Sequence, residues 1–317
     1  MIRFFVQAAV MMLGLTALAS QSEADAVRLA LNWKAEPQFG GFYAAQVSGH
    51  FAAEGLDVEI IEGGSGAPTI QIVGANQVEY AIVAADEIVI SHDRGAGNVV
   101  ALFAVYQTYP QAIMVHRARG FKGLEDVFNN EGTLLWQGGL PYAQFLSRRY
   151  APARVRTAPY LGGIGNFQND PMISQQCFAT SEPLTAARAG LAVDTFMIAD
   201  SGYNPYTTVL VTTRDRLANH PDEAKRMVAA VRAGWESYLA DPSATNAAMG
   251  SINKAMDATT FSESAAVQVP LIRPEGLVQL GTMTQERWTL LVQQLSELKV
   301  IRKAIDPSVL FVNLGNE

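Results

Sequence analysis

Three side chains in one short segment could bind a flat, polar molecule. Asn32, Trp33 and Glu36 follow an apolar, strand-like segment at residues 27–31. An indole can stack on a planar ring, while amide and carboxylate groups can bind its polar edge. The same residue types also have ordinary structural roles: a tryptophan can pack beneath its own helix, and Asn32 or Glu36 can cap the helix expected near Phe39. The segment alone leaves both interpretations open.

A second carboxylate stands in a comparable position much later in the chain. Glu182 follows a strand-like segment at residues 177–180 and precedes Pro183, which suits the first turn of a helix. A carboxylate there can accept hydrogen bonds from an exocyclic amine or a protonated ring nitrogen. It can equally be the acidic residue that the helix dipole favours at a helix start. Glycine turns at 63–66 and 162–163 could hold an anion through backbone N–H groups or could simply be turns.

The residue types that most enzymes and metal sites use are sparse in this sequence. Cys177 is the only cysteine, so an intramolecular disulfide is impossible, and the four histidines are scattered without metal-ligand spacing. The sequence contains no G-x-S-x-G elbow, no Walker motif and no complete G-x-G-x-x-G motif. We therefore predict no metal site, no cofactor and no covalent catalytic centre.

Composition is typical of a soluble globular protein. The chain has 317 residues, 49% of them hydrophobic and 17% charged, which is enough for two core-forming units. Its formal net charge of −7 gives no support for a nucleic-acid or anionic-membrane partner.

The N-terminal residues have the pattern of a secretory signal peptide. Arg3 precedes an apolar run at residues 4–18, and Ala-x-Ala sites occur at 17–19 and 24–26. The run is shorter than the ~20 apolar residues that a membrane-spanning helix needs. We therefore expect residues 1–26 to be removed on export and the mature protein to be periplasmic.

Strand-like and helix-like segments alternate from residue 27 onward, which predicts an α/β fold with mostly parallel sheets. The pattern changes near residues 110–116 and again near 205–211. We predict two α/β lobes joined by two crossings, with 27–112 and 208–317 in lobe 1 and 113–207 in lobe 2. The helical C-terminal part is expected to pack back on lobe 1.

Apolar runs and glycine turns predict the elements of the second lobe. Strands are expected at 133–136, 155–161, 177–180 and 193–198. Helices are expected at 141–150 and from the 162–163 turn through residue 173.

In open α/β sheets, ligands bind outside the carboxyl ends of the strands. If the two lobes face each other, the turns at those ends line one cleft. We take ten residues as candidate ligand contacts, although the spacing of Tyr43 also places it on a core-facing helix side. They are Asn32, Trp33, Glu36, Tyr43, Glu87, Gln107, Gly162, Asn166, Glu182 and Tyr203.

Several segments resemble one known family. At 31–33, 39–46, 49–51 and 54–58, and again at 177–183, the chain is similar to the NMT1/THI5-like substrate-binding proteins of ABC transporters. The resemblance extends over essentially the whole mature chain and is greatest to binders of thiamine-precursor pyrimidines, of the hydroxymethylpyrimidine or formylaminopyrimidine type.

The resemblance implies a type II periplasmic binding fold whose lobes close on ligand by a hinge. It further implies that Trp33 stacks on the pyrimidine and that Asn32 and Glu182 lie near its polar edge. The expected partners are a small heteroaromatic solute and an inner-membrane ABC permease, and the expected state is a monomer. Relatives with this fold bind sulfonates, nitrate or riboflavin. The predicted cleft turns contain Lys34 but no arginine, which favours a neutral or weakly basic heteroaromatic solute over an anion.

The same superfamily includes a eukaryotic pyridoxal-phosphate-dependent pyrimidine synthase, which is the alternative from a different functional class. Alignment by eye places Val83 where that enzyme has its cofactor-bearing lysine, and Glu87 where it has its donor histidine. The enzyme's cysteine-rich run corresponds to residues 175–179. Without the lysine no Schiff base can form, so the alignment disfavours the enzyme.

Overall fold

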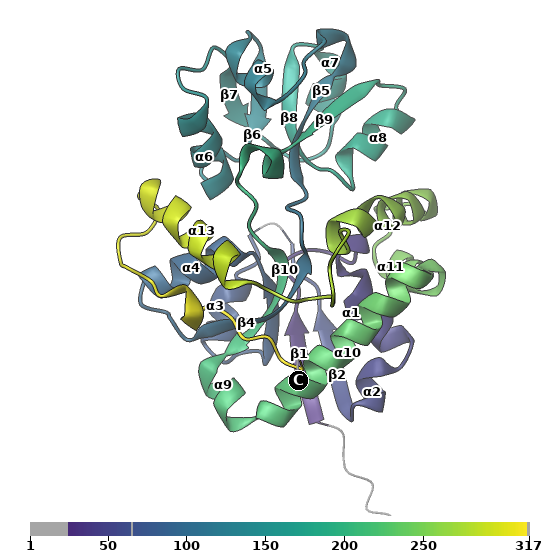
Figure 1. The fold of residues 1–317 in the computed structure, drawn as a ribbon. Coiled ribbons are helices and arrows are strands. Elements are labelled where there is room, and N and C mark those ends of the chain that lie inside the picture. Colours follow the sequence, from purple (N-terminus) through teal and green to yellow (C-terminus); the bar gives the residue numbers. More distant parts are fainter. Residues whose placement is uncertain (1–24, 65, 316–317) are drawn as a thin grey trace, which may run out of the picture.

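The computed structural model describes residues 25–64 and 66–315. Within these residues, two five-stranded sheets are each covered by helices and connected by two segments (Figure 1). The predicted signal peptide lies outside the described residues, except for Asp25 and Ala26, which belong to the first strand. The described residues include no helix that is both long and apolar enough to cross a membrane.

Sheet A, the sheet of the first lobe, has the strand order β2–β1–β3–β10–β4. Strand β1 pairs in parallel with β2 and β3, whereas β10 pairs antiparallel with β3 and β4. The strands are β1 (Asp25–Ala30), β2 (Leu56–Ile61), β3 (Tyr80–Val83), β4 (Val99–Tyr106) and β10 (Thr207–Thr213).

Sheet B, the sheet of the second lobe, has the strand order β7–β6–β8–β5–β9. Strand β6 pairs in parallel with β7 and β8, and β5 pairs antiparallel with β8 and β9. The strands are β5 (Gln111–His116), β6 (Thr133–Trp136), β7 (Arg156–Pro159), β8 (Ile173–Phe178) and β9 (Val193–Met197).

The expectation of two α/β lobes is confirmed, but the sheets are mixed rather than mostly parallel. The antiparallel strands are β10 in sheet A and β5 in sheet B, the strands through which the chain enters each sheet from the other lobe. The parallel strands of each sheet have their carboxyl ends at the edge that faces the other lobe. A strand that enters the sheet from the other lobe starts at this same edge, so it runs antiparallel to them. The topology of the crossings therefore sets the strand direction.

Helices cover both sheets. In the first lobe they are α1 (Gly40–Val47), α2 (His50–Ala53), α3 (Thr69–Gly74), α4 (Ala85–Asp93), α9 (Arg214–Asn219), α10 (Pro221–Ala240), α11 (Ser243–Ile252), α12 (Ala258–Ile272) and α13 (Gln285–Glu297). In the second lobe they are α5 (Leu124–Asn129), α6 (Pro141–Arg149), α7 (Gly165–Asn169) and α8 (Glu182–Arg188). Short 3-10 helices are η1 (Pro37–Phe39), η2 (Arg117–Arg119), η3 (Ile198–Ser201) and η4 (Pro307–Val309).

The long C-terminal helix α10 packs closely against α1, as the expected return of the C-terminal part to lobe 1 requires (Figure 1). A Cβ atom on Gly41 would lie 2.2 Å from the ring of Trp235, and one on Gly234 would lie 2.2 Å from the carbonyl oxygen of Gly41. Only glycine allows this approach. Because α1 follows η1 directly, this packing fixes the segment that carries Trp33 and Glu36.

Two short segments carry the chain between the sheets. The first lies between Tyr106, the last residue of β4, and Gln111, which already pairs with Phe178 of sheet B. The second lies between Ser201, the end of η3, and Thr207, which pairs with Tyr106 of sheet A. The crossings are therefore residues 107–110 and 202–206, a few residues before the predicted positions.

Strand β8 begins at Ile173, although the sequence predicts a helix up to that residue and a strand only from 177 to 180. The prediction is wrong because the strand begins with an unusual run of buried polar residues: Ser174, Gln175 and Gln176 are all nearly inaccessible to solvent. Gln175 Nε2 donates to the carbonyl oxygen of Gly163 at 2.9 Å, so its burial is compensated by hydrogen bonding. A hydrophobicity pattern does not detect such a strand.

Candidate functional site

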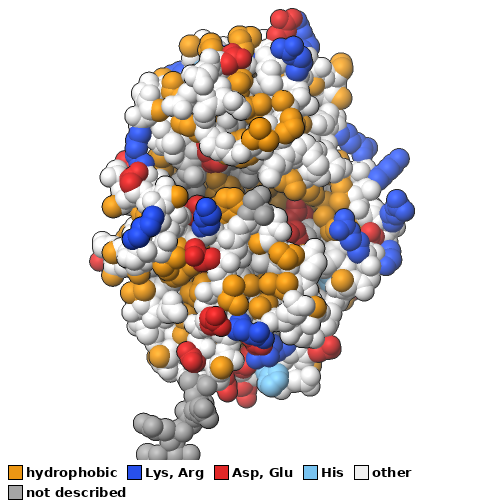
Figure 2. All heavy atoms as spheres, turned by 180° about the vertical axis from the view of Figure 1, so that it is seen from behind, with side chains coloured by type: hydrophobic (Ala, Val, Ile, Leu, Met, Phe, Trp, Pro, Cys, Tyr) orange, Lys and Arg blue, Asp and Glu red, His pale blue; other side chains and the backbone are white. Residues whose placement is uncertain are grey.

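The carboxyl ends of the parallel strands in both sheets point toward the gap between the lobes. In sheet A, β4 leaves from this edge to enter the second lobe, and β1 and β3 run in the same direction as β4. In sheet B, β8 ends opposite Gln111, the first residue after the crossing. The turns that follow β1, β3, β6, β7 and β8 therefore face one another. Figure 2 shows a hollow between the two halves, with hydrophobic and acidic side chains along it.

Trp33 lies in the turn after β1, and 37% of its surface is exposed. Its indole Nε1 donates a hydrogen bond to Oε1 of Glu36 at 3.0 Å. The backbone of this turn is also restrained, because Glu62 Oε1 accepts a hydrogen bond from the amide of Ala35 at 2.6 Å and Gly63 N donates to the Trp33 carbonyl at 3.0 Å. The indole is thus oriented and remains partly accessible, as a stacking platform requires.

Glu36 precedes η1, yet its side chain makes no helix-capping hydrogen bond to the described backbone. Its carboxylate instead accepts hydrogen bonds from Trp33 and from Gln38 Nε2, the latter at 3.1 Å. Burial raises the pKa of Glu36, the two hydrogen bonds oppose that rise, and the nearby negative charge of Glu182 adds to it. Glu36 therefore does not cap η1, and its carboxylate orients the Trp33 indole instead.

Glu182 is the first residue of α8 and comes from the second lobe. Its Oε2 accepts a hydrogen bond from the amide of Phe178 at 2.8 Å, and its Oε1 accepts one from the Tyr160 hydroxyl at 2.9 Å. Burial raises its pKa, and these hydrogen bonds lower it. The ring of Phe178 packs edge-on against Tyr106 of the first lobe, with centroids 6.1 Å apart, and Gln268 links Tyr106 to the carbonyl oxygen of Pro37. The segments that carry Glu182 and Glu36 therefore meet across the gap.

Two further acidic residues lie in the first turn of α4, just after β3. Glu87 Oε2 accepts a hydrogen bond from the amide of Ala84 at 2.8 Å, and burial raises the pKa of Glu87 to about 7. Burial also raises the pKa of Asp86 to about 6. The hydroxyl of Tyr203 donates to Asp86 Oδ2 at 3.5 Å. These groups lie beside the second crossing rather than at the indole.

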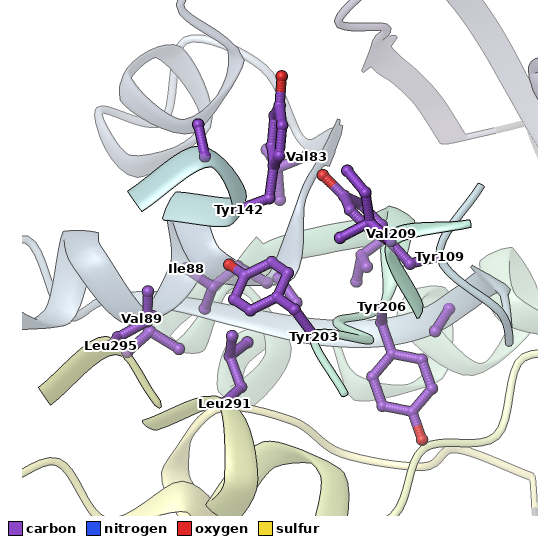
Figure 3. Close-up of a cluster of buried hydrophobic side chains, with 14 of the residues drawn as sticks. Val83, Ile88, Val89, Tyr109, Tyr142, Tyr203, Tyr206, Val209, Leu291 and Leu295 are labelled. Atoms are coloured by element: carbon purple, nitrogen blue, oxygen red, sulfur yellow. The ribbon is translucent and has the colours of Figure 1, made fainter. Parts of the chain in front are cut away.

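Tyr203 is completely buried, which differs from the exposed position that a ligand contact would need. Figure 3 shows its ring among Ile88, Val89 and Leu291. The ring also packs edge-on against Tyr109, with centroids 6.0 Å apart. Tyr203 therefore joins the core next to the crossings.

Three other candidates are buried in the core, hydrogen-bonded to the backbone, or distant from the gap between the lobes. Tyr43 is 3% exposed in the core of the first lobe, and burial raises the pKa of its hydroxyl. Gln107 Nε2 donates to the carbonyl oxygens of Ala104 and Thr282 at 3.0 and 3.1 Å. Asn166 adjoins Phe167, whose carbonyl oxygen contacts His116 Nε2 at 2.8 Å at the end of β5 remote from the crossing.

Asn32 and Gly162 lie in turns beside the gap, as the sequence predicts, although no side-chain hydrogen bond among the described residues assigns either of them a role. Asn32 is partly buried in the same turn as Trp33. Gly162 has a φ of +94°, which favours glycine, and is exposed in the loop after β7. Both lie in turns at the carboxyl ends of strands.

Sequence reasoning missed Tyr160, which binds Glu182. It directly follows β7, so the strand-end rule could have identified it, but the predicted strand at 155–161 placed it inside the sheet. Gln176 was also missed. Its Oε1 accepts hydrogen bonds from the amide of Gln137 and the hydroxyl of Tyr142, at 2.5 and 2.6 Å.

A cavity of about 420 Å³ lies at the carboxyl ends of β6 and β7, where Trp136, the turn 137–140 and residues 157–160 line it. A second cavity of about 410 Å³ lies between α11 and α12, lined by residues such as Asn246, Gly250 and Phe261. Of these two cavities, only the first is lined by a partner of a candidate ligand contact: Tyr160, which donates a hydrogen bond to Glu182.

Two α/β lobes, two crossings and a polar gap between strand ends define the type II periplasmic binding fold, the fold of ABC-importer solute-binding proteins. Residues 36–131 and 172–245, more than half of the chain, match the family described as NMT1/THI5 like. The chain belongs to the NMT1/THI5-like family.

Known proteins similar to this chain include both binding proteins and an enzyme. A 4-amino-5-hydroxymethyl-2-methylpyrimidine phosphate synthase of Uromyces fabae is 24% identical over 251 residues, covering 74% of this chain and 72% of that protein. The riboflavin-binding protein RibY of Chloroflexus aurantiacus is 20% identical over 236 residues, covering 70% of this chain and 65% of RibY. The periplasmic aliphatic sulphonate binding protein SsuA of Escherichia coli has a similar structure, with a TM-score of 0.70, 11% identity and coverage of 92% and 94%.

Proposed function

We propose that this protein is the periplasmic solute-binding component of an ABC importer, and that it binds a thiamine-precursor pyrimidine of the hydroxymethylpyrimidine or formylaminopyrimidine type. It would deliver the solute, without covalent chemistry, to an inner-membrane permease. One observation carries the proposal: the partly exposed indole of Trp33 is held by Glu36, and Glu182 of the opposite lobe lies close to that pair.

The chemistry of these three groups suits an aminopyrimidine. The indole face can stack on the ring, which contributes roughly 0.5–1.5 kcal/mol beyond the burial of area. Two carboxylates can accept hydrogen bonds from an exocyclic amine and a protonated ring nitrogen. An anionic solute such as a sulfonate or nitrate would instead meet two like charges, which favours the pyrimidine over those alternatives.

The relatives support a heteroaromatic solute. The Uromyces protein is named for a pyrimidine phosphate, and RibY is named for riboflavin. Riboflavin is therefore the second heteroaromatic to be tested.

The residues at the enzyme's expected catalytic positions support binding rather than synthesis. Val83 is fully buried in β3, and a valine side chain has no amine with which to form a Schiff base. Glu87, in the position of the donor histidine, hydrogen-bonds the backbone of Ala84.

We further propose that the protein is a monomer. Its division into two lobes would be the predicted one, with the lobe boundaries shifted to the observed crossings. Residues 107–110 and 202–206 would form the hinge, with lobe 1 before the first and after the second. The predicted boundaries at 112 and 208 thus move by a few residues, because Gln111 and Ala112 pair in sheet B and Thr207 pairs in sheet A.

Calorimetric titration of the mature protein with hydroxymethylpyrimidine, riboflavin and an alkanesulfonate tests the proposed function. We expect the pyrimidine to bind and Trp33→Ala to weaken it about tenfold or more, because stacking and apolar burial are both lost. Val278→Ala is a matched control, since Val278 is 99% exposed. Binding of riboflavin or the sulfonate alone would refute the pyrimidine assignment.

A further inference from the structure

The cavity at the carboxyl ends of β6 and β7 has no role in the proposed stacking site. Its walls are the turn 137–140 on one side and residues 157–160 on the other. Its volume of about 420 Å³ is large enough for a ring substituent of several atoms.

Tyr160 connects this cavity to the stacking site. Tyr160 is one of the residues that line the cavity, and its hydroxyl donates to Glu182 Oε1 at 2.9 Å. Glu182 also accepts a hydrogen bond from the amide of Phe178, whose ring packs edge-on against Tyr106 with centroids 6.1 Å apart. The Tyr106 hydroxyl donates to Gln268, which donates to the carbonyl oxygen of Pro37, the residue after Glu36, and Glu36 holds the indole of Trp33. A solute that stacks on Trp33 and reaches Glu182 therefore lies next to Tyr160, a residue that lines the cavity.

The chemistry of the walls selects against charge. Among the described residues, those lining the cavity are aromatic, aliphatic, glycine or neutral polar, and none is ionisable except the Tyr160 phenol. Burial and the adjacent Glu182 raise the pKa of that phenol, so it stays neutral. An anionic group would lie near the Glu182 carboxylate without a cation to balance it. Thr157 and Gln137 can hydrogen-bond an uncharged polar group.

The turn that forms one wall is fixed before any solute arrives. Gln137 N donates to Gln176 Oε1 at 2.5 Å, and Gln176 Nε2 donates back to Gln137 Oε1 at 3.1 Å. Gly139, also in this turn, has open space around it: a Cβ there would meet no described heavy atom within 4 Å. Its φ lies outside the left-handed region, so larger residues fit its backbone. Because Gly139 lines the cavity, a larger side chain can be introduced at its edge without a clash with the described protein.

We propose that this cavity is a second compartment of the solute site and takes an uncharged, hydrogen-bonding substituent of the ring that stacks on Trp33. This inference rests on the proposed function and specifies the class of solute. The protein would distinguish pyrimidines by the group attached to the ring, and a phosphorylated group would be rejected.

A series of pyrimidines with one ring and four substituents at the same position tests the proposal: methyl, hydroxymethyl, formylaminomethyl and phosphorylated hydroxymethyl. We expect the two neutral polar substituents to bind more tightly than methyl, and the phosphate ester to bind most weakly. Gly139→Val should weaken binding of the formylaminomethyl compound about tenfold because it fills the compartment, while binding of the methyl compound changes less than about twofold.

Gly123→Val is the matched control. A Cβ atom on Gly123 would also meet no described heavy atom within 4 Å, but this residue precedes α5, at the opposite edge of sheet B from the gap. Thermal unfolding of both variants checks that they are folded. Equal weakening of all four compounds by Gly139→Val, or tightest binding of the phosphate ester, would overturn the compartment while leaving the pyrimidine function standing. Failure of every pyrimidine to bind the unmodified protein would overturn the proposed function itself.

Discussion

Glu36 of the first lobe and Glu182 of the second lie close enough for the negative charge of Glu182 to raise the pKa of Glu36, in addition to the larger effect of burial. The two residues are far apart in sequence and belong to different lobes. Under the proposed function, their proximity would let two carboxylates bind one solute in the gap between the lobes.

Removing the charge of Glu182 should lower the pKa of Glu36. In Glu182→Gln the pKa of Glu36 should move toward, but not reach, its ordinary value, because burial remains. Side-chain carboxyl titration by NMR measures this directly. Glu131→Gln, an exposed carboxylate beside Arg154, serves as the control and should leave Glu36 unaffected. An unchanged pKa in Glu182→Gln would mean that the two groups are not neighbours in solution.

Stability should depend on pH through Glu87. Burial raises its pKa from 4.5 to about 7, so between these values the folded protein holds a proton that the unfolded chain has released. The free energy of unfolding should therefore fall as pH rises from about 4.5 to 7, by about 2–3 kcal/mol from this group. Urea unfolding at several pH values should show a weaker dependence for Glu87→Gln than for wild type. Asp86, whose pKa burial raises to about 6, accounts for part of the remaining dependence; identical profiles would contradict the role of Glu87.

Arg188 should hold the lobes together. Its guanidinium, on α8, contacts Asp257, Thr260 and Glu263 at the start of α12 in the first lobe. Arg188→Ala removes these contacts between lobes, so solute affinity should fall about twofold to tenfold, and less at high salt. Calorimetric titration at low and high salt measures both effects. Arg154→Ala, whose ion pair with Glu131 lies within the second lobe, is the control. Equal affinities for Arg188→Ala and wild type would show that these contacts do not favour closure.

Arg287 should stabilise the two crossings. Its Nη1 donates to the carbonyl of Gln107 at 2.6 Å, its Nη2 donates to the carbonyl of Asn204 at 2.7 Å, and the guanidinium lies 3.7 Å from the ring centre of Tyr206. Arg287→Met leaves both carbonyls without these donors, and the free energy of unfolding should fall by about 2–4 kcal/mol. Urea denaturation measures the change. Arg302→Met, at an exposed position, should have little effect, and a comparable loss there would argue against a specific role for Arg287.

The predicted signal peptide should be cleaved after Ala19 rather than after Ala26. Asp25 belongs to β1, its amide donates to the carbonyl of Gly55 at 3.1 Å, and its carboxylate accepts from Arg226 Nη2 at 2.6 Å. Cleavage after Ala26 would remove these contacts. The intact mass and N-terminal sequence of the exported protein identify the site, and a chain that begins at Val27 would refute this prediction.

Local patterns in the sequence were sufficient to predict the α/β class, the two lobes and the position of Trp33 and Glu182 at strand ends. These features depend on hydrophobic periodicity and glycine or proline at turns, which act over a few residues. They could not predict the first part of β8, because Ser174, Gln175 and Gln176 are polar residues whose burial depends on partners elsewhere in the chain.

Only the tertiary structure decided what the candidate side chains contact. Glu36 could have been a helix cap, but it binds the indole of Trp33, and Tyr160 became a neighbour of Glu182 through the order of the strands in sheet B. Tyr203 and Gln107 satisfy the strand-end rule in sequence, yet packing turns them into the protein beside the crossings. The contacts of each side chain depend on which distant segments meet in the fold. The physical reason is that the hydrogen bonds and close packing of these side chains form between elements and not within one element.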